Sequence, residues 1–220
     1  MRPPFTYAPP TAPIAVLYRD DDLLFVDKPA GLLSVPGRLL EHRDCLLTRL
    51  QGDDPAVLLV HRLDMDTSGV MVFARTPAAQ KTLNWQFEQR STRKTYLAEV
   101  TGHPACNSGT VTAPLMRDWP NRPLQKIDAA GKPSQTDWRV IRRAAETSFV
   151  ELTPITGRSH QLRVHMAGIG HAIVGDLFYA DAAVAGLSDR LHLHAAELTC
   201  VHPETQQPLT VTAPCDFIAP

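Results

Sequence analysis

The sequence lacks the features that mark membrane-spanning, secreted and disulfide-bonded proteins. None of its apolar runs is long enough to cross a bilayer, and the start, Met1-Arg2-Pro3-Pro4, lacks the apolar segment of a signal peptide. Cysteine is scarce and scattered, without a Cys-x-x-Cys spacing, at Cys45, Cys106, Cys200 and Cys215. This usage favours reduced thiols in a cytoplasmic protein over disulfides or a zinc site.

A metal-binding motif and an overall excess of one charge are also absent. Neither His160 with His165 nor His192 with His194 has the His-x-x-x-His spacing of a helical metal site, which favours structural or RNA-contacting histidines. The formal net charge is −1, yet residues 90–143 carry ten basic and four acidic side chains, a local net charge of +6. Such segregation can form the basic face that phosphate binding requires, and solvated strand faces explain it equally well.

The chain does contain enough apolar residues, 44% of 220, to bury one sizeable core. Residues 1–13 carry five prolines and no periodicity, which predicts a flexible leader that is too short to be a separate RNA-binding domain. We therefore expect a single domain over residues 14–220.

Short apolar runs separated by turn residues dominate the pattern of this domain. They predict strands over residues 14–18, 23–27, 57–60, 70–74, 93–100, 134–141, 148–152, 191–201 and 208–213. Thr76 as N-cap and Pro77 as first residue predict a helix that ends at Glu88. Two shorter helices are expected, one capped by Asp44 and ending at residue 51, the other capped by Ser159 and ending near residue 168 with a buried stripe of Leu162, Met166 and Ile169.

The candidate chemistry lies in residues 61–69, which we call the signature loop and which connect two of the predicted strands. Residues two apart in an extended chain point the same way, so Arg62 and Asp64 are expected to face one cleft and His61 the other side. Gly69 permits a positive φ at the end of the loop. A structural turn with a surface ion pair would use the same residue types.

The motif His-Arg-Leu-Asp followed by Thr-Ser-Gly resembles the signature of the RluA-type pseudouridine synthases, which isomerise uridine to pseudouridine in RNA. Further segments resemble the same family in order along the chain, namely Lys-Pro-x-Gly at 28–31, Lys-x-Tyr-x-Ala at 94–98 and Gly-Arg-x-His-Gln-x-Arg-x-His at 157–165. The resemblance implies that Asp64 is the catalytic carboxylate, that Tyr96 stacks on the target base, and that Arg163 pairs with Asp64. It also implies an α+β fold with a mostly antiparallel mixed β-sheet, flanking helices and a central catalytic cleft, without cofactor or metal.

RNA recognition is expected to use basic and aromatic side chains around this cleft. Arg62 can fill the space of a flipped uridine or hold its phosphate. The loop 118–126 combines a tryptophan with arginine and lysine, as contacts to splayed bases do, and with the loop 32–38 it resembles the small family member that acts on both ribosomal and transfer RNA. The predicted RNA contacts are Arg62, His61, Arg38, Arg122, Lys126, Arg158, His160 and Leu193. The expected substrates are stem-loops of large-subunit ribosomal RNA and tRNA anticodon arms, bound by a monomer.

Two other functions stay open on the residues alone. One is a non-catalytic RNA-binding protein on the same fold, which the intact Asp64, Tyr96 and Arg163 disfavour. The other is a metal-dependent hydrolase built from the histidines and Asp64. For an isomerase, Asp64 has two chemical roles open to it, nucleophile or base at the sugar.

Overall fold

The computed structural model describes residues 6–218 of the chain. Its strands are β1 (Ala15–Arg19), β2 (Leu23–Lys28), β3 (Leu58–Leu59), β4 (Ser68–Ala74), β5 (Arg93–Thr101), β6 (Ser108–Val111), β7 (Leu115–Arg117), β8 (Gln125–Ile127), β9 (Thr136–Arg143), β10 (Thr147–Pro154), β11 (Leu193–Val201) and β12 (Pro208–Thr212). Its helices are the 3-10 turn η1 (Leu40–His42), α1 (Leu46–Asp53), α2 (Pro77–Glu88), α3 (Gln161–Gly168) and α4 (Ala182–Ala185).

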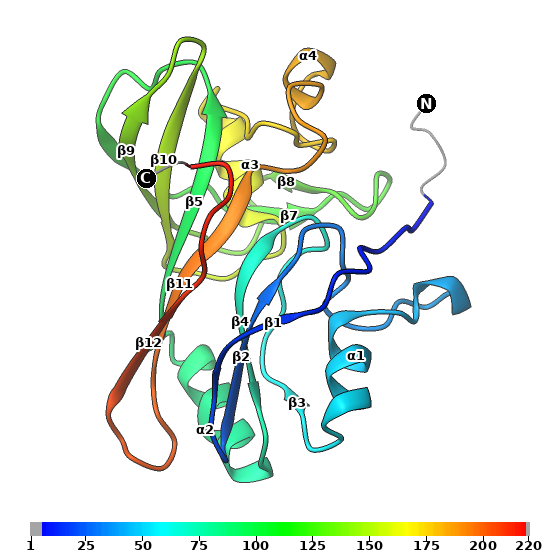
Figure 1. Ribbon diagram of the computed structural model, residues 1–220. Helices are drawn as coiled ribbons and strands as arrows, with labels where there is room; N and C mark the ends of the chain where they lie inside the picture. The colour runs from blue at the N-terminus through cyan, green and yellow to red at the C-terminus, as the bar shows by residue number, and fades with distance from the viewer. Residues whose placement is uncertain (1–5, 219–220) are drawn as a thin grey trace.

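Ten of the strands form one sheet with the order β1-β2-β4-β11-β5-β10-β9-β6, in which β12 pairs with β11 and β3 pairs with β4 (Figure 1). The strands β7 and β8 form a separate antiparallel hairpin. Every pairing in the large sheet is antiparallel except that of β11 with β4. The predicted α+β fold with a mostly antiparallel mixed sheet is therefore confirmed.

The parallel contact between β4 and β11 joins the two halves of the sheet at the end of the signature loop. Gly69 lies opposite Ala195 and has a φ of +110°, which confirms the predicted positive φ. A Cβ atom at Gly69 would lie 2.2 Å from the carbonyl oxygen of Ala195. Only glycine allows the two strands to approach this closely.

The helices flank the sheet and close three apolar clusters. Strand β4 is buried along its whole length and contributes to two of them. Helix α2 buries Ala79 and Leu83 against β4 and β11, and α1 buries Leu46 and Leu50 on another cluster. Helix α3 covers β5, β10 and β11. This last cluster fixes the helix whose N-terminal end reaches the candidate site.

Local caps differ from the predictions at two helices. Helix α1 begins after Cys45, which is its N-cap and forms a capping box with Thr48. The predicted cap, Asp44, forms an ion pair with Arg49 instead. Helix α3 begins at Gln161 after a left-handed residue, without a side-chain cap, so the predicted Ser159 cap is wrong. Its stripe is correct at Leu162 and Met166 but wrong at Ile169, which is 37% exposed just beyond the helix end.

Part of the predicted leader, residues 1–5, lies outside the described residues. Within the remainder, the hydroxyl of Tyr7 donates to the carbonyl of Asp44, and the carbonyl of Pro10 accepts from Arg49. These contacts fix a segment that its proline content had suggested to be flexible.

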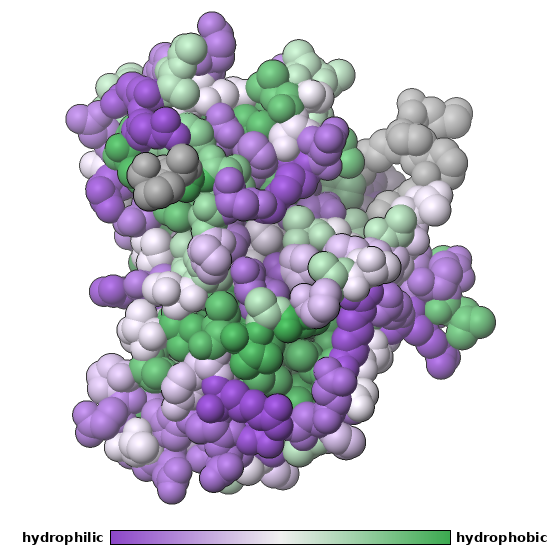
Figure 2. Space-filling model, in the orientation of Figure 1, coloured by the Kyte–Doolittle hydropathy of each residue, from purple (hydrophilic) through white to green (hydrophobic). Residues whose placement is uncertain are grey.

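The face in Figure 2 is mostly hydrophilic, with apolar side chains gathered between β1 and β12. Across residues 6–218, no helix has the length and apolar character needed to span a membrane.

Candidate active site

A cavity of about 470 Å³ opens beside the signature loop. Its walls come from the start of that loop, from β5, from the segment leading into α3 and from the first residue of β11. Eight of the predicted site residues line it, namely His61, Arg62, Asp64, Tyr96, Arg158, His160, Arg163 and Leu193. Segments far apart in the sequence thus meet at one cleft, and only Arg38, Arg122 and Lys126 of the predicted set lie outside its lining.

Buried hydrogen bonds hold the signature loop in its place under the cavity. The hydroxyl of Ser34 donates to the carbonyl of Leu63 at 2.7 Å and accepts the N–H of the same residue at 3.2 Å. The buried Lys28 ammonium donates to the carbonyls of Pro29, Leu32 and Met65, each at 2.8 Å. Burial lowers the pKa of Lys28 to about 7. These contacts give the Lys-Pro-x-Gly segment a supporting role beneath Asp64.

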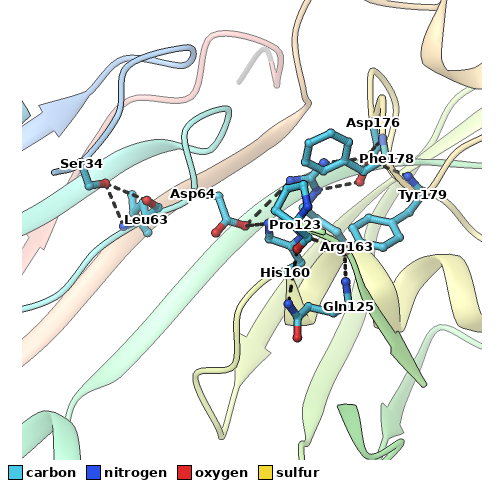
Figure 3. Close-up of polar contacts among 10 residues, drawn as sticks. All are labelled: Ser34, Leu63, Asp64, Pro123, Gln125, His160, Arg163, Asp176, Phe178 and Tyr179. Carbon is cyan, nitrogen blue, oxygen red and sulfur yellow. Dashed lines mark hydrogen bonds and ion pairs between the residues drawn. The ribbon is translucent and has the colours of Figure 1, made fainter. Parts of the chain in front are cut away.

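Asp64 lies in the cleft with its side chain 23% exposed. Its Oδ2 atom is 3.9 Å from Nη1 of Arg163 and 3.9 Å from Nε2 of His160 (Figure 3). Both distances exceed a hydrogen bond, and within residues 6–218 the carboxylate accepts none. The carboxylate is therefore close to positive charge and still free to react.

The direct partner of Arg163 is Asp176, a residue that the sequence reasoning did not include in the site. Nε and Nη2 of Arg163 donate to the two carboxylate oxygens of Asp176 at 2.8 and 2.6 Å. The two side chains are 2% and 0% exposed. Burial opposes the charge of Arg163, but the hydrogen bonds and charge of Asp176 outweigh it, so its pKa is raised. The predicted pairing of Arg163 with Asp64 is present as an ion pair at 3.9 Å, longer than the hydrogen-bonded pair of Arg163 with Asp176.

Aromatic rings cover the buried pair. The guanidinium carbon of Arg163 lies 4.8 Å from the ring centre of Phe178 and 5.3 Å from that of Tyr179. Asp176 also accepts the backbone N–H groups of both aromatic residues. Nothing in the sequence of the turn that carries all three residues indicates that its carboxylate pairs with Arg163.

The opposite wall is aromatic and partly apolar. Tyr96 on β5 is half-buried, and burial raises its pKa, so its phenol stays protonated at neutral pH. Leu193 is buried beside it at the start of β11. Lys94, two residues before Tyr96 on the same strand face, also lines the cavity, with its ammonium 5.4 Å from the Phe87 ring centre. Sequence alternation placed Lys94 beside Tyr96 without marking it as a site residue.

His61 belongs to the wall of the cavity. Its ring stacks on Phe87 at 4.6 Å, and its Nε2 accepts the backbone N–H of Val72 at 3.1 Å. Burial lowers the pKa of His61 to about 3, so the ring is neutral at physiological pH. The structure therefore gives His61 a packing role and excludes a charged contact to phosphate there.

Exposed cations surround the mouth of the cleft. Arg62 is exposed next to Asp64, and Arg158 is half-buried at the segment before α3. Arg117 at the end of β7 also lines the cavity, although the sequence had indicated it only as one of several basic residues. Three arginines from separate segments can thus contact the backbone of a nucleic acid whose base enters the cavity.

The hairpin of β7 and β8 extends this basic surface. The exposed Trp119 ring lies close to two guanidinium groups, with its centre 5.0 Å from that of Arg117 and 5.3 Å from that of Arg122. Lys126 forms an ion pair with Asp128 at 2.9 Å. Arg122 and Lys126 therefore lie on a neighbouring surface rather than in the cavity itself. Arg38 is exposed on a loop and does not line the cavity.

Metal chemistry has no evident donor set in the described part of the chain. Over residues 6–218, no three side chains of histidine, cysteine, aspartate or glutamate lie close enough together to hold a metal ion. The four cysteines are free thiols. The hydrolase hypothesis therefore has no cluster of ligands to build on among these residues.

Comparison with known proteins agrees with the geometry of the site. Residues 22–168 match the model of the family described as RNA pseudouridylate synthase. The chain is 52% identical over 214 residues to the dual-specificity RNA pseudouridine synthase RluA of Escherichia coli strain K12, covering 96% of this chain and 98% of the relative. It is 51% identical over 218 residues to the protein of the same name from Vibrio vulnificus strain CMCP6, covering 96% of this chain and 87% of the relative.

Solved structures give the same result for the fold. Human RNA pseudouridylate synthase domain containing 1 superposes with a TM-score of 0.78 at 30% identity, covering 99% of this chain and 88% of the human one. Human RNA pseudouridylate synthase domain containing 4 superposes with a TM-score of 0.75 at 25% identity, covering 92% and 89%. The similarity extends over nearly the whole chain, so it includes every wall of the cavity.

Proposed function

Because this chain belongs to the RNA pseudouridylate synthase family, we propose that it isomerises uridine to pseudouridine in RNA with Asp64 as the catalytic carboxylate. One observation carries this proposal: Asp64, Tyr96 and Arg163, which come from three separate segments, line a single cavity. A non-catalytic RNA-binding protein would have no need for a carboxylate held between an arginine and a histidine beside an aromatic wall. The family assignment also disfavours the hydrolase alternative.

The reaction explains why these side chains are needed. The glycosidic bond must break, the uracil must rotate, and a carbon of the ring must bond to the ribose. The target uridine has to leave its stack, which costs a few kcal/mol, and stacking on Tyr96 would return about 1–3 kcal/mol. Arg163 lies 3.9 Å from Asp64, so its positive charge is close to the carboxylate without a hydrogen bond that would have to be broken first. Asp64 then acts at the sugar as nucleophile or base.

The proposed substrates are stem-loops of both large-subunit ribosomal RNA and tRNA anticodon arms. Relatives more than 50% identical to this chain carry the name dual-specificity RNA pseudouridine synthase. The cleft is rimmed by Arg62, Arg117 and Arg158, and the hairpin with Trp119 lies next to it. Such a surface suits a short, shaped element with bases turned outward. We further propose a cytoplasmic monomer, which the free cysteines and an RNA substrate both suit.

The decisive experiment on Asp64 is the substitution Asp64→Asn. It removes the charge and keeps the volume, so tritium release from labelled uridine should stop while RNA affinity stays within a few-fold. Asp66→Asn is a matched control, because it makes the same change two residues along the loop at a side chain outside the cavity lining. Substantial turnover by Asp64→Asn would contradict the catalytic assignment.

The substrate proposal is tested with two minimal stem-loops, one from a tRNA anticodon arm and one from large-subunit ribosomal RNA. Both should be modified. The double variant Arg122→Gln/Lys126→Gln should weaken binding to both and lower the salt slope by roughly one unit per lost phosphate contact. Arg139→Gln, on β9 away from the cavity, controls for the loss of a surface charge. Modification of an assembled ribosomal particle alone would contradict recognition of isolated stem-loops.

A further inference from the structure

His160 occupies an unusual backbone conformation directly beside Asp64. It has φ 54° and ψ 15°, the left-handed region that residues other than glycine rarely adopt. The residue precedes α3, and its side chain makes no capping hydrogen bond to the helix. Strain of this kind persists where the surrounding structure imposes it, often at functional sites. The conformation turns the imidazole into the cavity, between Asp64 and Tyr179.

A chain of hydrogen bonds fixes the orientation of this ring. The backbone N–H of Gln125 donates to the hydroxyl oxygen of Tyr179 at 2.9 Å, and this oxygen lies 2.6 Å from Nδ1 of His160 (Figure 3). Nδ1 is the one acceptor for the phenolic proton among residues 6–218. When Tyr179 donates to Nδ1, the neutral imidazole must carry its own proton on Nε2.

The protonation states of both groups agree with this pattern. Burial raises the pKa of Tyr179 to about 12, which keeps its hydroxyl a donor. Burial also lowers the pKa of His160, with the charge of Asp64 acting in the opposite direction. The imidazole is therefore neutral at neutral pH. The charged groups that act on it are Asp64, Arg163, Asp176 and Arg62.

His160 and Arg163 both lie close to the same oxygen of the Asp64 carboxylate. Nε2 of His160 and Nη1 of Arg163 both lie 3.9 Å from Oδ2 of Asp64. A relative movement of about 1 Å would bring either group into hydrogen-bond range.

We propose that His160 is a positioning residue for Asp64, presenting an Nε2–H that Tyr179 fixes in place, so that the carboxylate is held at Oδ2. The inference rests on the proposed catalytic role of Asp64. It also ties the β7–β8 hairpin to the reaction, because the hydrogen-bond chain starts at Gln125, the first residue of β8. The same hairpin carries the predicted RNA contacts Arg122 and Lys126.

The tautomer is tested directly by two-bond proton–nitrogen NMR on protein labelled at histidine. The spectrum of His160→Gln identifies the signals of His160 by their disappearance. In the unsubstituted protein, His160 should be the Nε2–H tautomer at neutral pH. In Tyr179→Phe, Nδ1 loses its donor, so a mixture of tautomers and a higher imidazole pKa are expected. An Nδ1–H tautomer or a charged imidazole in the unsubstituted protein would overturn the proposal.

Kinetics test whether the Nε2–H matters to turnover. His160→Leu should lower kcat about tenfold or more with little change in KM, since a hydrogen bond to a charged group is worth at least that factor. His160→Gln, whose amide can offer an N–H at a similar place, should recover part of the loss. Tyr179→Phe should lower kcat, whereas Tyr18→Phe, which removes a hydroxyl bonded to Asp20 away from the cavity, should not. Equal kcat values for the Gln and Leu variants would refute the positioning role.

The two proposals can fail separately. If Asp64→Asn remained active, the catalytic assignment would fall, and the NMR result would still report the state of His160. If Asp64→Asn were inactive and His160→Leu retained full kcat, the catalytic role would stand and the positioning role would fall. Thermal unfolding of each variant distinguishes a lost fold from a lost tautomer.

Discussion

The buried pair of Arg163 and Asp176 should contribute strongly to the stability of the fold. Asp176→Asn keeps the shape of the side chain but leaves the Arg163 guanidinium, 2% exposed, facing an amide that cannot neutralise it. Breaking a buried ion pair by removing one partner costs about 3–5 kcal/mol. For a chain of this size, that corresponds to a fall in Tm of roughly 6 to 20 °C. Urea unfolding gives the free energy of unfolding directly.

A double-mutant cycle separates the pair from its surroundings. Arg163→Met leaves a carboxylate fully buried, although Asp176 still accepts N–H groups from Phe178 and Tyr179. The double variant Asp176→Asn/Arg163→Met removes both charges, so it should lose much less stability than the two single variants added together. The matched control is the pair of Arg139 and Glu151, 3.0 Å apart and 60% and 31% exposed, whose coupling should stay below about 1 kcal/mol. Additive losses at the buried pair would refute the reasoning.

Two further predictions concern the signature loop. Gly69→Ala should lower the thermal unfolding temperature severely, since a Cβ atom there would lie 2.2 Å from the Ala195 carbonyl oxygen. The control Gly52→Ala in α1, which has open space around it, should be neutral or stabilising. Burial lowers the pKa of His61 to about 3 in the folded protein, below its usual value of about 6.5. Between these two pH values the unfolded chain binds a proton at His61 that the folded protein does not. The free energy of unfolding should therefore fall as the pH drops from about 6.5 towards 3. Urea unfolding across that range should show a shallower decline for His61→Gln, and identical slopes would contradict the buried neutral ring.

Elements specified by local signals could be predicted from the sequence. Thr76 accepts the N–H of Ala79 and Pro77 begins α2, as its cap and proline indicated. The cap of α1 could not be predicted in the same way, because Asp44 is by type a better cap than Cys45. In the structure, the Asp44 carboxylate forms an ion pair with Arg49 instead. The choice between two adjacent caps depends on neighbours that residue type alone does not rank.

The residues of the candidate site could also be predicted only in part. Motif resemblance identified the residues that face the cavity, including Asp64 and Tyr96. It did not identify Asp176, which is 0% exposed and acts by holding Arg163. The useful signal was the chemistry of Arg163 itself, because an arginine on a buried helix face requires a carboxylate partner. Which carboxylate that is depends on how the chain returns over α3, and this is set by tertiary packing.

Two carboxylates lie close to Arg163 in different ways, which would leave Asp64 free to act in the proposed reaction. Asp176 takes the Nε and Nη2 donors of Arg163, which leaves Nη1 as the group nearest to Asp64. At 3.9 Å, Arg163 and Asp64 are in ion-pair range without a hydrogen bond between them. A bidentate hydrogen bond from Arg163 would occupy the Asp64 oxygens that the proposed reaction needs at the sugar. A second, buried carboxylate therefore fixes the orientation of the arginine that lies beside the proposed catalytic carboxylate.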